Sequence, residues 1–261
     1  YGDSKTGKST FMRALVAGIA MDRALFPSMQ HEHAKGIYLI GKDGNGQFME
    51  GISAQFGDLN ERDRDTIGDS LKVICSDAKL LRERTEHERK QDLIDFRNGD
   101  IEADDINVQK WCRTALFKNL SELIQLGNFD FMVVDHVSKF MGNLPLKDDD
   151  QMRDPMDVLC DFARGLDIAL ILIHHSKDTS KAWQNKMGML GGTVLKHQSR
   201  SIIRVERNRN TTKVIHEATN YGADEKSGKL PVIRRRRSSW TAWTRRLPLS
   251  MRPASRFTNG G

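Results

Sequence analysis

The chain has 261 residues, of which 38% are hydrophobic and 29% charged, and its formal net charge at pH 7 is +6. This composition is that of a globular, soluble protein, and it contains no apolar run long enough to span a bilayer. Three widely separated cysteines argue against a disulfide framework or a cysteine-rich metal site and favour the reducing cytoplasm: Cys75, Cys112 and Cys160.

The first predicted element is a phosphate-binding loop, GDSKTGKST, which fits the pattern G-x-x-x-x-G-K-[ST] at every required position. In such loops backbone N–H groups converge on the phosphates, the lysine (Lys8) reaches the β- and γ-phosphates, and the hydroxyl (Ser9) binds Mg²⁺. Apolar residues at helical spacing follow, so a Gly-rich turn before an ordinary helix is the weaker alternative. The predicted nucleoside triphosphate site consists of Gly2, Asp3, Ser4, Lys5, Thr6, Gly7, Lys8, Ser9 and Thr10.

Four short apolar runs follow the loop: GIYLIG (36–41), LKVIC (71–75), FDFMVVD (129–135) and IALILIH (168–174). Helical spacing is found between them, around residues 45–56, 107–126 and 151–166. Continuous β-branched runs are typical of parallel strands that are buried on both faces. The alternation predicts an α/β fold with a mainly parallel central sheet flanked by helices, and with ligands at the carboxyl ends of the strands. A densely charged stretch, Leu80 to Asp105, is interpreted as a solvated insertion of helix and loop.

The third apolar run ends in Asp135. In nucleotide hydrolases an aspartate at this place holds Mg²⁺ through water, whereas elsewhere it commonly caps a helix or turn. The GKS triplet upstream favours the metal role, with Ser9 and Asp135 as the metal-binding residues. A phosphate loop normally follows a buried strand, but this chain begins at Tyr1. We therefore expect an N-terminal strand to be missing, and expect that strand to pack beside the strand of Asp135.

The fourth run ends in His174 and His175. A neutral imidazole at the carboxyl ends of the strands could sense the γ-phosphate through a hydrogen bond. A structural histidine at the end of a strand is the alternative. A metal role is not favoured, because no partner lies four residues on and no cysteine is near.

The last segment of the chain is a basic tail. Residues 234–261 hold eight arginines and no acidic residue, so residues 1–233 carry a net charge of −2. We divide the chain into one α/β domain over 1–233 and this tail over 234–261. Its lack of periodicity predicts disorder, although Trp240 and Trp243 could stack on unpaired bases of a nucleic acid.

The order of the phosphate loop, IYLIGKD, FMVVDHVSKF, ILIHHSKD, GGTVL and NYG resembles the RepA-type hexameric replicative helicases of plasmids and phages, a branch of the RecA-like ATPases. The resemblance covers roughly residues 1–225. It implies a RecA-like core that forms a homo-oligomer, a hexameric ring, with ATP and Mg²⁺ at each subunit interface and single-stranded DNA in the middle. It further implies that His175 is the γ-phosphate sensor, and that Arg200, which follows GGTVL, is an arginine finger inserted into the neighbouring subunit's site. From the residues alone, a surface charge at the start of a strand fits Arg200 equally well.

Two positions depart from the pattern of that family. Where these helicases place a catalytic Glu next to an Asp, this chain has Lys42 and Asp43. Asp43 becomes the candidate general base; otherwise another acid takes this role or hydrolysis is slow. Where they carry a lysine shortly before NYG, this chain has Glu217-Ala218-Thr219, which leaves Arg200 as the cation acting between subunits. The segment from Thr179 to Gly192 resembles their DNA-facing loop, with Lys181 and Lys186 as candidate phosphate contacts, and a plain exposed loop fits it equally well.

Three functions agree with these features. The first is an ATP-dependent DNA helicase or translocase in plasmid or phage replication. The second is a RecA-like recombination or strand-annealing ATPase that switches its DNA affinity without unwinding. The third is a small-molecule kinase, which would need the Arg-rich region 80–100 as an acceptor-binding lid.

Overall fold

A computed structural model describes residues 6–23, 33–41, 44–57, 59–99, 111–141, 149–174, 192–208, 211–219 and 233–234. Its centre is a parallel sheet whose strands lie in the order β2-β1-β5-β6. These strands are β1 (Gly36–Ile40), β2 (Leu71–Cys75), β5 (Phe131–Asp135) and β6 (Ala169–Ile173). Every residue of β1 and β5 is buried, as expected for central strands covered on both faces. The predicted α/β fold with a parallel sheet is confirmed.

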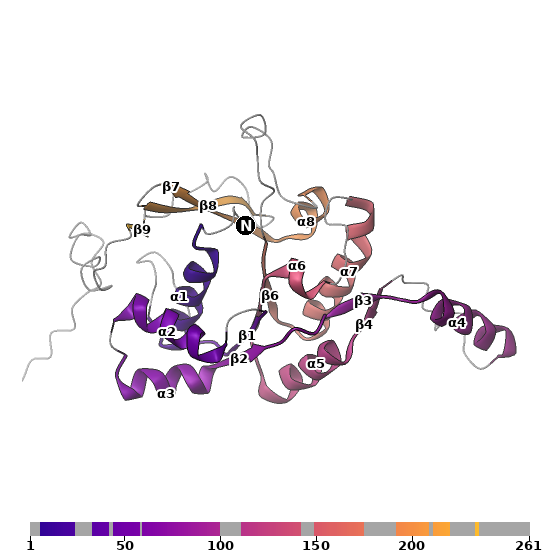
Figure 1. The fold of residues 1–261 in the computed structure, drawn as a ribbon, viewed down its shortest axis with the longest axis horizontal. Coiled ribbons are helices and arrows are strands. Elements are labelled where there is room, and N and C mark those ends of the chain that lie inside the picture. The colour runs from indigo at the N-terminus through magenta and orange to yellow at the C-terminus, as the bar shows by residue number, and fades with distance from the viewer. Residues whose placement is uncertain are drawn as a thin grey trace, which may run out of the picture.

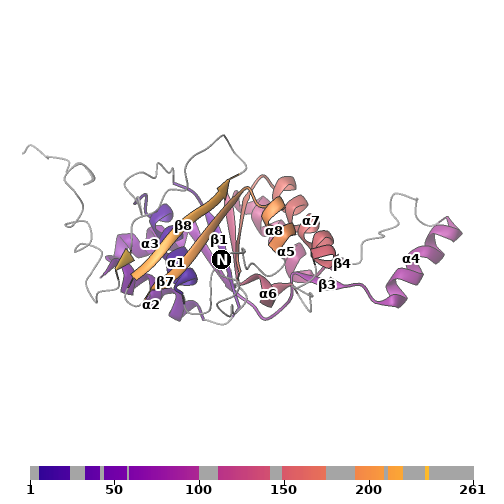
Figure 2. The ribbon, with the colours of Figure 1, turned by 90° about the horizontal axis from the view of Figure 1, so that it is seen from above.

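Helices cover both faces of this sheet (Figures 1 and 2). Alternate side chains of β1 and β5 point to opposite faces, so Tyr38 and Val133 pack with one group of helices while Leu39 and Val134 pack with the other. The first group consists of α1 (Lys8–Ala20), α2 (Asn45–Phe56) and α3 (Glu61–Ser70). The second consists of α5 (Ala115–Gly127), α6 (Val137–Phe140), α7 (Asp149–Gly165) and α8 (Gly192–Gln198). Among the described helices, none is long and apolar enough to cross a membrane.

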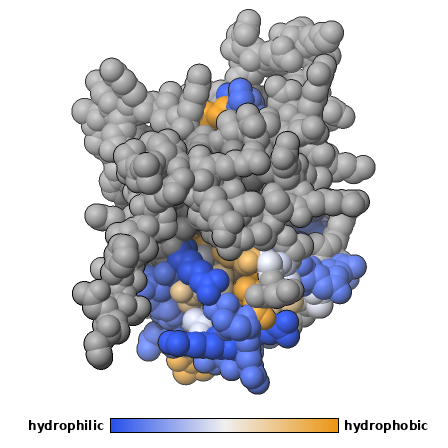
Figure 3. Space-filling model, turned by 90° about the vertical axis from the view of Figure 1, so that its left-hand side faces the viewer, coloured by the Kyte–Doolittle hydropathy of each residue, from blue (hydrophilic) through white to orange (hydrophobic). Residues whose placement is uncertain are grey.

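The outer side of the first helix group is mostly hydrophilic (Figure 3). In α3, for example, Ile67 is buried against the sheet while Glu61, Arg62 and Arg64 are exposed. Asn60 begins this helix as its N-cap, because its side-chain oxygen accepts a hydrogen bond of 2.8 Å from the N–H of Asp63. These helices therefore seal one face of the sheet with a single apolar side each.

The charged insertion forms an arm of three elements, β3 (Leu81–Glu83), α4 (Glu86–Asn98) and β4 (Trp111–Arg113). β3 and β4 pair antiparallel, and α4 stands away from the body of the molecule (Figures 1 and 2). The predicted solvated helix is present in α4. The prediction of helix from residue 107 was wrong at Trp111, which lies in β4, because α5 begins only after its N-cap Thr114.

A second, antiparallel sheet consists of β7 (Ser201–Asn208), β8 (Thr211–Thr219) and β9 (Ile233–Arg234). Phe11 and Ala14 of α1 pack against Val205 and Val214 of this sheet, which fixes its position over the N-terminal half of α1. β9 includes Arg234, the first residue of the predicted tail. The rest of the tail, with Trp240 and Trp243, lies outside the described residues, and the division of the chain at 233/234 stays a prediction.

The prediction that the strand before the phosphate loop packs beside the strand of Asp135 was wrong. β5 is paired along its whole length with β1 on one side and with β6 on the other. Because a strand has only two hydrogen-bonding edges, a strand that precedes the phosphate loop cannot pair with β5. The histidine strand, β6, occupies the place that we had expected for it.

Candidate functional site

The N-terminus of α1 has the geometry of an anion site. Gly7 precedes the helix with φ of 96°, a left-handed conformation that glycine adopts without strain. Its carbonyl accepts the first helical hydrogen bond, from the N–H of Phe11 at 2.8 Å. Within the described part of the chain, no side chain caps this helix and its first turn has no acidic residue. The partial positive charge of the helix end is therefore available to a phosphate group.

Lys8 adds a full positive charge at the same place. It is the first residue of α1 and only 7% exposed, and Thr6 is equally buried. Thr6 to Thr10 thus lie at the N-terminus of α1, and their role in binding a nucleotide stays a prediction. Gly2, Asp3, Ser4 and Lys5 lie outside the described residues.

The carboxylate of Asp135 lies beside this helix end. Ser9 Oγ donates a hydrogen bond of 3.1 Å to Asp135 Oδ1, and Tyr38 Oη donates one of 2.7 Å to Asp135 Oδ2. Asp135 is 7% exposed, at the carboxyl end of β5, where its register partners are Ile40 of β1 and Ile173 of β6. The structure therefore brings together Ser9 and Asp135, as the sequence predicts.

This pair of oxygen ligands fits Mg²⁺, which prefers carboxylate and hydroxyl oxygens and usually keeps the rest of its shell for phosphates and water. Across the described ranges, no group of three or more His, Cys, Asp or Glu side chains could hold a metal ion by itself. A cation bound by Ser9 and Asp135 would therefore complete its coordination with the phosphates of a nucleotide held at α1.

Tyr38 is the residue of this site that sequence reasoning missed. It is fully buried in β1, and its ring packs on Phe48 of α2 with centroids 4.7 Å apart. Burial, then the charge of Asp135 and the hydrogen bond to it, raise the pKa of Tyr38 well above its usual range, while Arg13 acts in the opposite direction. The hydroxyl therefore remains protonated at neutral pH and acts as a donor to Asp135. Its only signal in the sequence is a polar atom inside an apolar run.

A second missed group borders the site at Gly41. The N–H of Gly41 donates to the carbonyl of Asp135 at 3.2 Å, which ties the end of β1 to the carboxyl end of β5. The side chain of Lys139 crosses Gly41 so closely that a Cβ there would lie 2.2 Å from Lys139 Cδ. Lys139 continues to an ion pair with Asp77, and its hydrogen bond lowers the pKa of that carboxyl. Lys42 and the candidate base Asp43 follow directly in the chain and lie outside the described residues.

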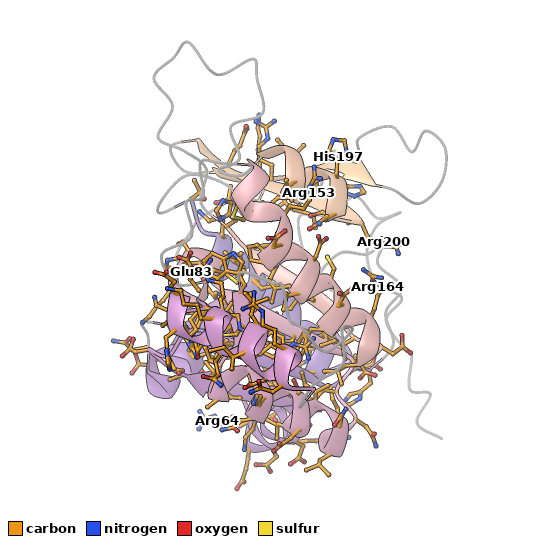
Figure 4. All side chains as sticks on the ribbon, turned by 90° about the vertical axis from the view of Figure 1, so that its right-hand side faces the viewer. Arg64, Glu83, Arg153, Arg164, His197 and Arg200 are labelled. Atoms are coloured by element: carbon orange, nitrogen blue, oxygen red, sulfur yellow. The ribbon has the colours of Figure 1, made fainter. Side chains whose placement is uncertain are left out.

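Of the two predicted histidines, the structure describes His174. His174 is buried, 3% exposed, immediately after β6, while His175 and the loop with Lys181 and Lys186 lie outside the described residues. Arg200 is exposed between α8 and β7. Figure 4 shows it beside Arg164. Burial raises the pKa of the Cys160 thiol in α7, and the positive charges of Arg164 and Arg200 both act to lower it.

Arg200 therefore does not join the pair of Ser9 and Asp135. α7 packs on the sheet face opposite to α1, with the helix group of Leu39 and Val134.

A protein-family model described as an AAA domain matches residues 1–181, which include the phosphate loop, Asp135 and the histidines. No curated protein matches the chain.

Proposed function

The chain belongs to the AAA domain family of P-loop ATPases, and from that premise we propose that it is an ATP-dependent DNA helicase or translocase of the RepA type, acting in plasmid or phage replication. We place it in the cytoplasm, with single-stranded DNA as its partner and a hexameric ring as its assembly. The observation that carries this proposal is the pairing of Ser9 with Asp135 at the N-terminus of α1, together with the position of Arg200 beside α7, across the sheet from α1.

The proposed site divides the work among a few side chains. Lys8 and the backbone N–H groups of α1 would bind the phosphates, and Ser9 and Asp135 would hold Mg²⁺. When bound, this cation neutralises charge on the phosphoryl oxygens that are being transferred. Asp43 would take the proton of the attacking water, and His175 would sense the γ-phosphate. These last two roles are proposed from the sequence.

The position of Arg200 supports action between subunits. A finger must reach the transferring phosphoryl group, which in this fold would lie at the N-terminus of α1. Arg200 is exposed beside α7, on the other face of the sheet from α1. An exposed guanidinium at this place would be within reach of a neighbouring subunit in a ring that holds nucleotide at each interface.

The proposal is tested by steady-state ATP hydrolysis on the full-length protein, with and without single-stranded DNA. We expect ATP turnover to rise several-fold with DNA and a labelled strand to be displaced from a partial duplex in the presence of ATP. DNA-stimulated turnover accompanied by strand annealing, without displacement, would instead identify a recombination-type ATPase. Turnover that is indifferent to DNA would contradict both and point to a small-molecule kinase.

Asp135→Asn is expected to lower ATP turnover about 100-fold while leaving the sheet folded. The amide has nearly the shape of the carboxylate but lacks its charge, so it binds Mg²⁺ poorly. Turnover and the urea midpoint of unfolding should be measured together, with Asp130→Asn as the control. Asp130 lies just before the same strand, and its carboxylate accepts from the N–H of Lys35. Equal loss of turnover in both variants would contradict the metal role of Asp135.

A further inference from the structure

Three elements of the fold are joined at the carboxylate of Asp135. Its Oδ1 accepts a hydrogen bond from Ser9 of α1 at 3.1 Å, and its Oδ2 accepts one from Tyr38 of β1 at 2.7 Å. The motif predicts the first bond, since both residues serve Mg²⁺ in nucleotide hydrolases. The second bond lies on the side of the carboxylate away from Ser9 and has no place in that motif.

A carboxylate held by one hydrogen bond keeps considerable freedom, because rotation about its terminal torsion is broad. Two donors, one on each oxygen, fix the plane of the group. With Oδ2 bound to Tyr38, Oδ1 is the oxygen that faces Ser9 and the N-terminus of α1. Asp135 is only 7% exposed. Without the Tyr38 hydroxyl, its Oδ2 would lose this donor, and the carboxylate could rotate so that Oδ2 reaches another one.

Tyr38 can fix Asp135 only because its own hydroxyl is held in place. The ring is fully buried and packs at an interplanar angle of 60° on Phe48, which is also fully buried. The guanidinium of Arg13, one helical turn after Ser9 in α1, lies 5.3 Å from the centroid of Phe48. Gly51 of α2 leaves room for Arg13, since a Cβ at this glycine would lie 3.0 Å from Arg13 Nη1. The hydroxyl is thus built into the contact between α1, α2 and β1.

We propose that Tyr38 is a positioning residue of the Mg²⁺ site: its hydroxyl holds Oδ2 of Asp135 so that Oδ1 and Ser9 Oγ face the cation together. This inference rests on the proposed ATPase site. In this proposal Tyr38 acts through Asp135, to which its hydroxyl donates, and not directly on the nucleotide or the metal. Side chains that orient a metal ligand from behind typically contribute about 10- to 100-fold to metal affinity or activity.

The test uses Tyr38→Phe, which removes one oxygen atom and keeps the ring on Phe48. Binding of a fluorescent ATP analogue to the full-length protein is measured in EDTA and over a titration of Mg²⁺. We expect binding in EDTA to match that of the wild type, and the Mg²⁺ concentration for half-maximal enhancement of binding to rise about tenfold. Ser70→Ala is the matched control, because Ser70 is also buried and its hydroxyl is bonded to His33 at 2.8 Å, away from the site.

Two results would overturn the proposal. The first is that Tyr38→Phe needs the same Mg²⁺ concentration for half-maximal enhancement as the wild type, while Ser9→Ala needs a different one. The proposed ATPase site would then stand, without a role for Tyr38. The second is equal weakening of analogue binding in EDTA and in Mg²⁺, which would mean that the hydroxyl serves packing alone. If Lys8→Ala and Ser9→Ala also bind the analogue like the wild type, the proposed function itself fails along with this inference.

Discussion

Replacing Lys8 by alanine is expected to lower ATP turnover at least about 100-fold and to weaken binding of a fluorescent ATP analogue in parallel. The helix end of α1 supplies only partial positive charge, whereas Lys8 supplies a full charge at the same place. Because Lys8 is 7% exposed, its ammonium acts where water screens it little, so its loss is felt more strongly than that of a surface lysine.

The control for Lys8→Ala is Lys118→Ala, which removes the same charge from an exposed position on α5, across the sheet from α1. Turnover and analogue binding of Lys118→Ala should match the wild type. Urea unfolding of both variants separates loss of the charge from loss of the fold. Analogue binding by a folded Lys8→Ala protein that equals the wild type would show that the nucleotide site lies elsewhere.

The sequence predicted the parts of this site that depend on local patterns. A continuous apolar run that ends in an aspartate predicts a buried strand with the carboxylate at its carboxyl end, and Asp135 lies at the carboxyl end of β5. The phosphate-loop pattern and the apolar spacing after it predict a helix that follows the loop, and α1 begins there, at Lys8. The meeting of Ser9 with Asp135, 126 residues apart, followed from the chemistry of Mg²⁺ rather than from any local pattern.

What the sequence could not predict depends on pairing between distant segments. The apolar content of β6 indicates a strand but not its neighbours, so its place beside β5 was missed. In the hydrophobic pattern of β1, Tyr38 looks the same as a phenylalanine would. Its hydroxyl gains a role only because β5, which ends in Asp135, is the neighbouring strand. The contact of Lys139 with Gly41 and Asp77 likewise needs three segments to meet.

Arg200→Ala is the second substitution with a large expected effect, a loss of about 1,000-fold in DNA-stimulated ATP turnover. An arginine finger stabilises charge that develops on the phosphoryl group during transfer, so turnover should fall much more than affinity for the ATP analogue. Arg164→Ala is the matched control, since Arg164 lies beside Arg200 and is paired with Asp161 on the surface of α7. It should retain near wild-type turnover.

Mixing two inactive variants tests whether Arg200 acts on a neighbour. An Arg200→Ala subunit keeps an intact phosphate loop, and a Lys8→Ala subunit keeps its arginine. In a mixed assembly the first can receive the finger of the second, so an equal mixture should recover a clear fraction of wild-type turnover. A mixture that co-assembles by light scattering yet stays inactive would contradict action between subunits. Arg200 would then serve its own chain or its fold, although its exposed position across the sheet from α1 argues against a role at its own phosphate loop.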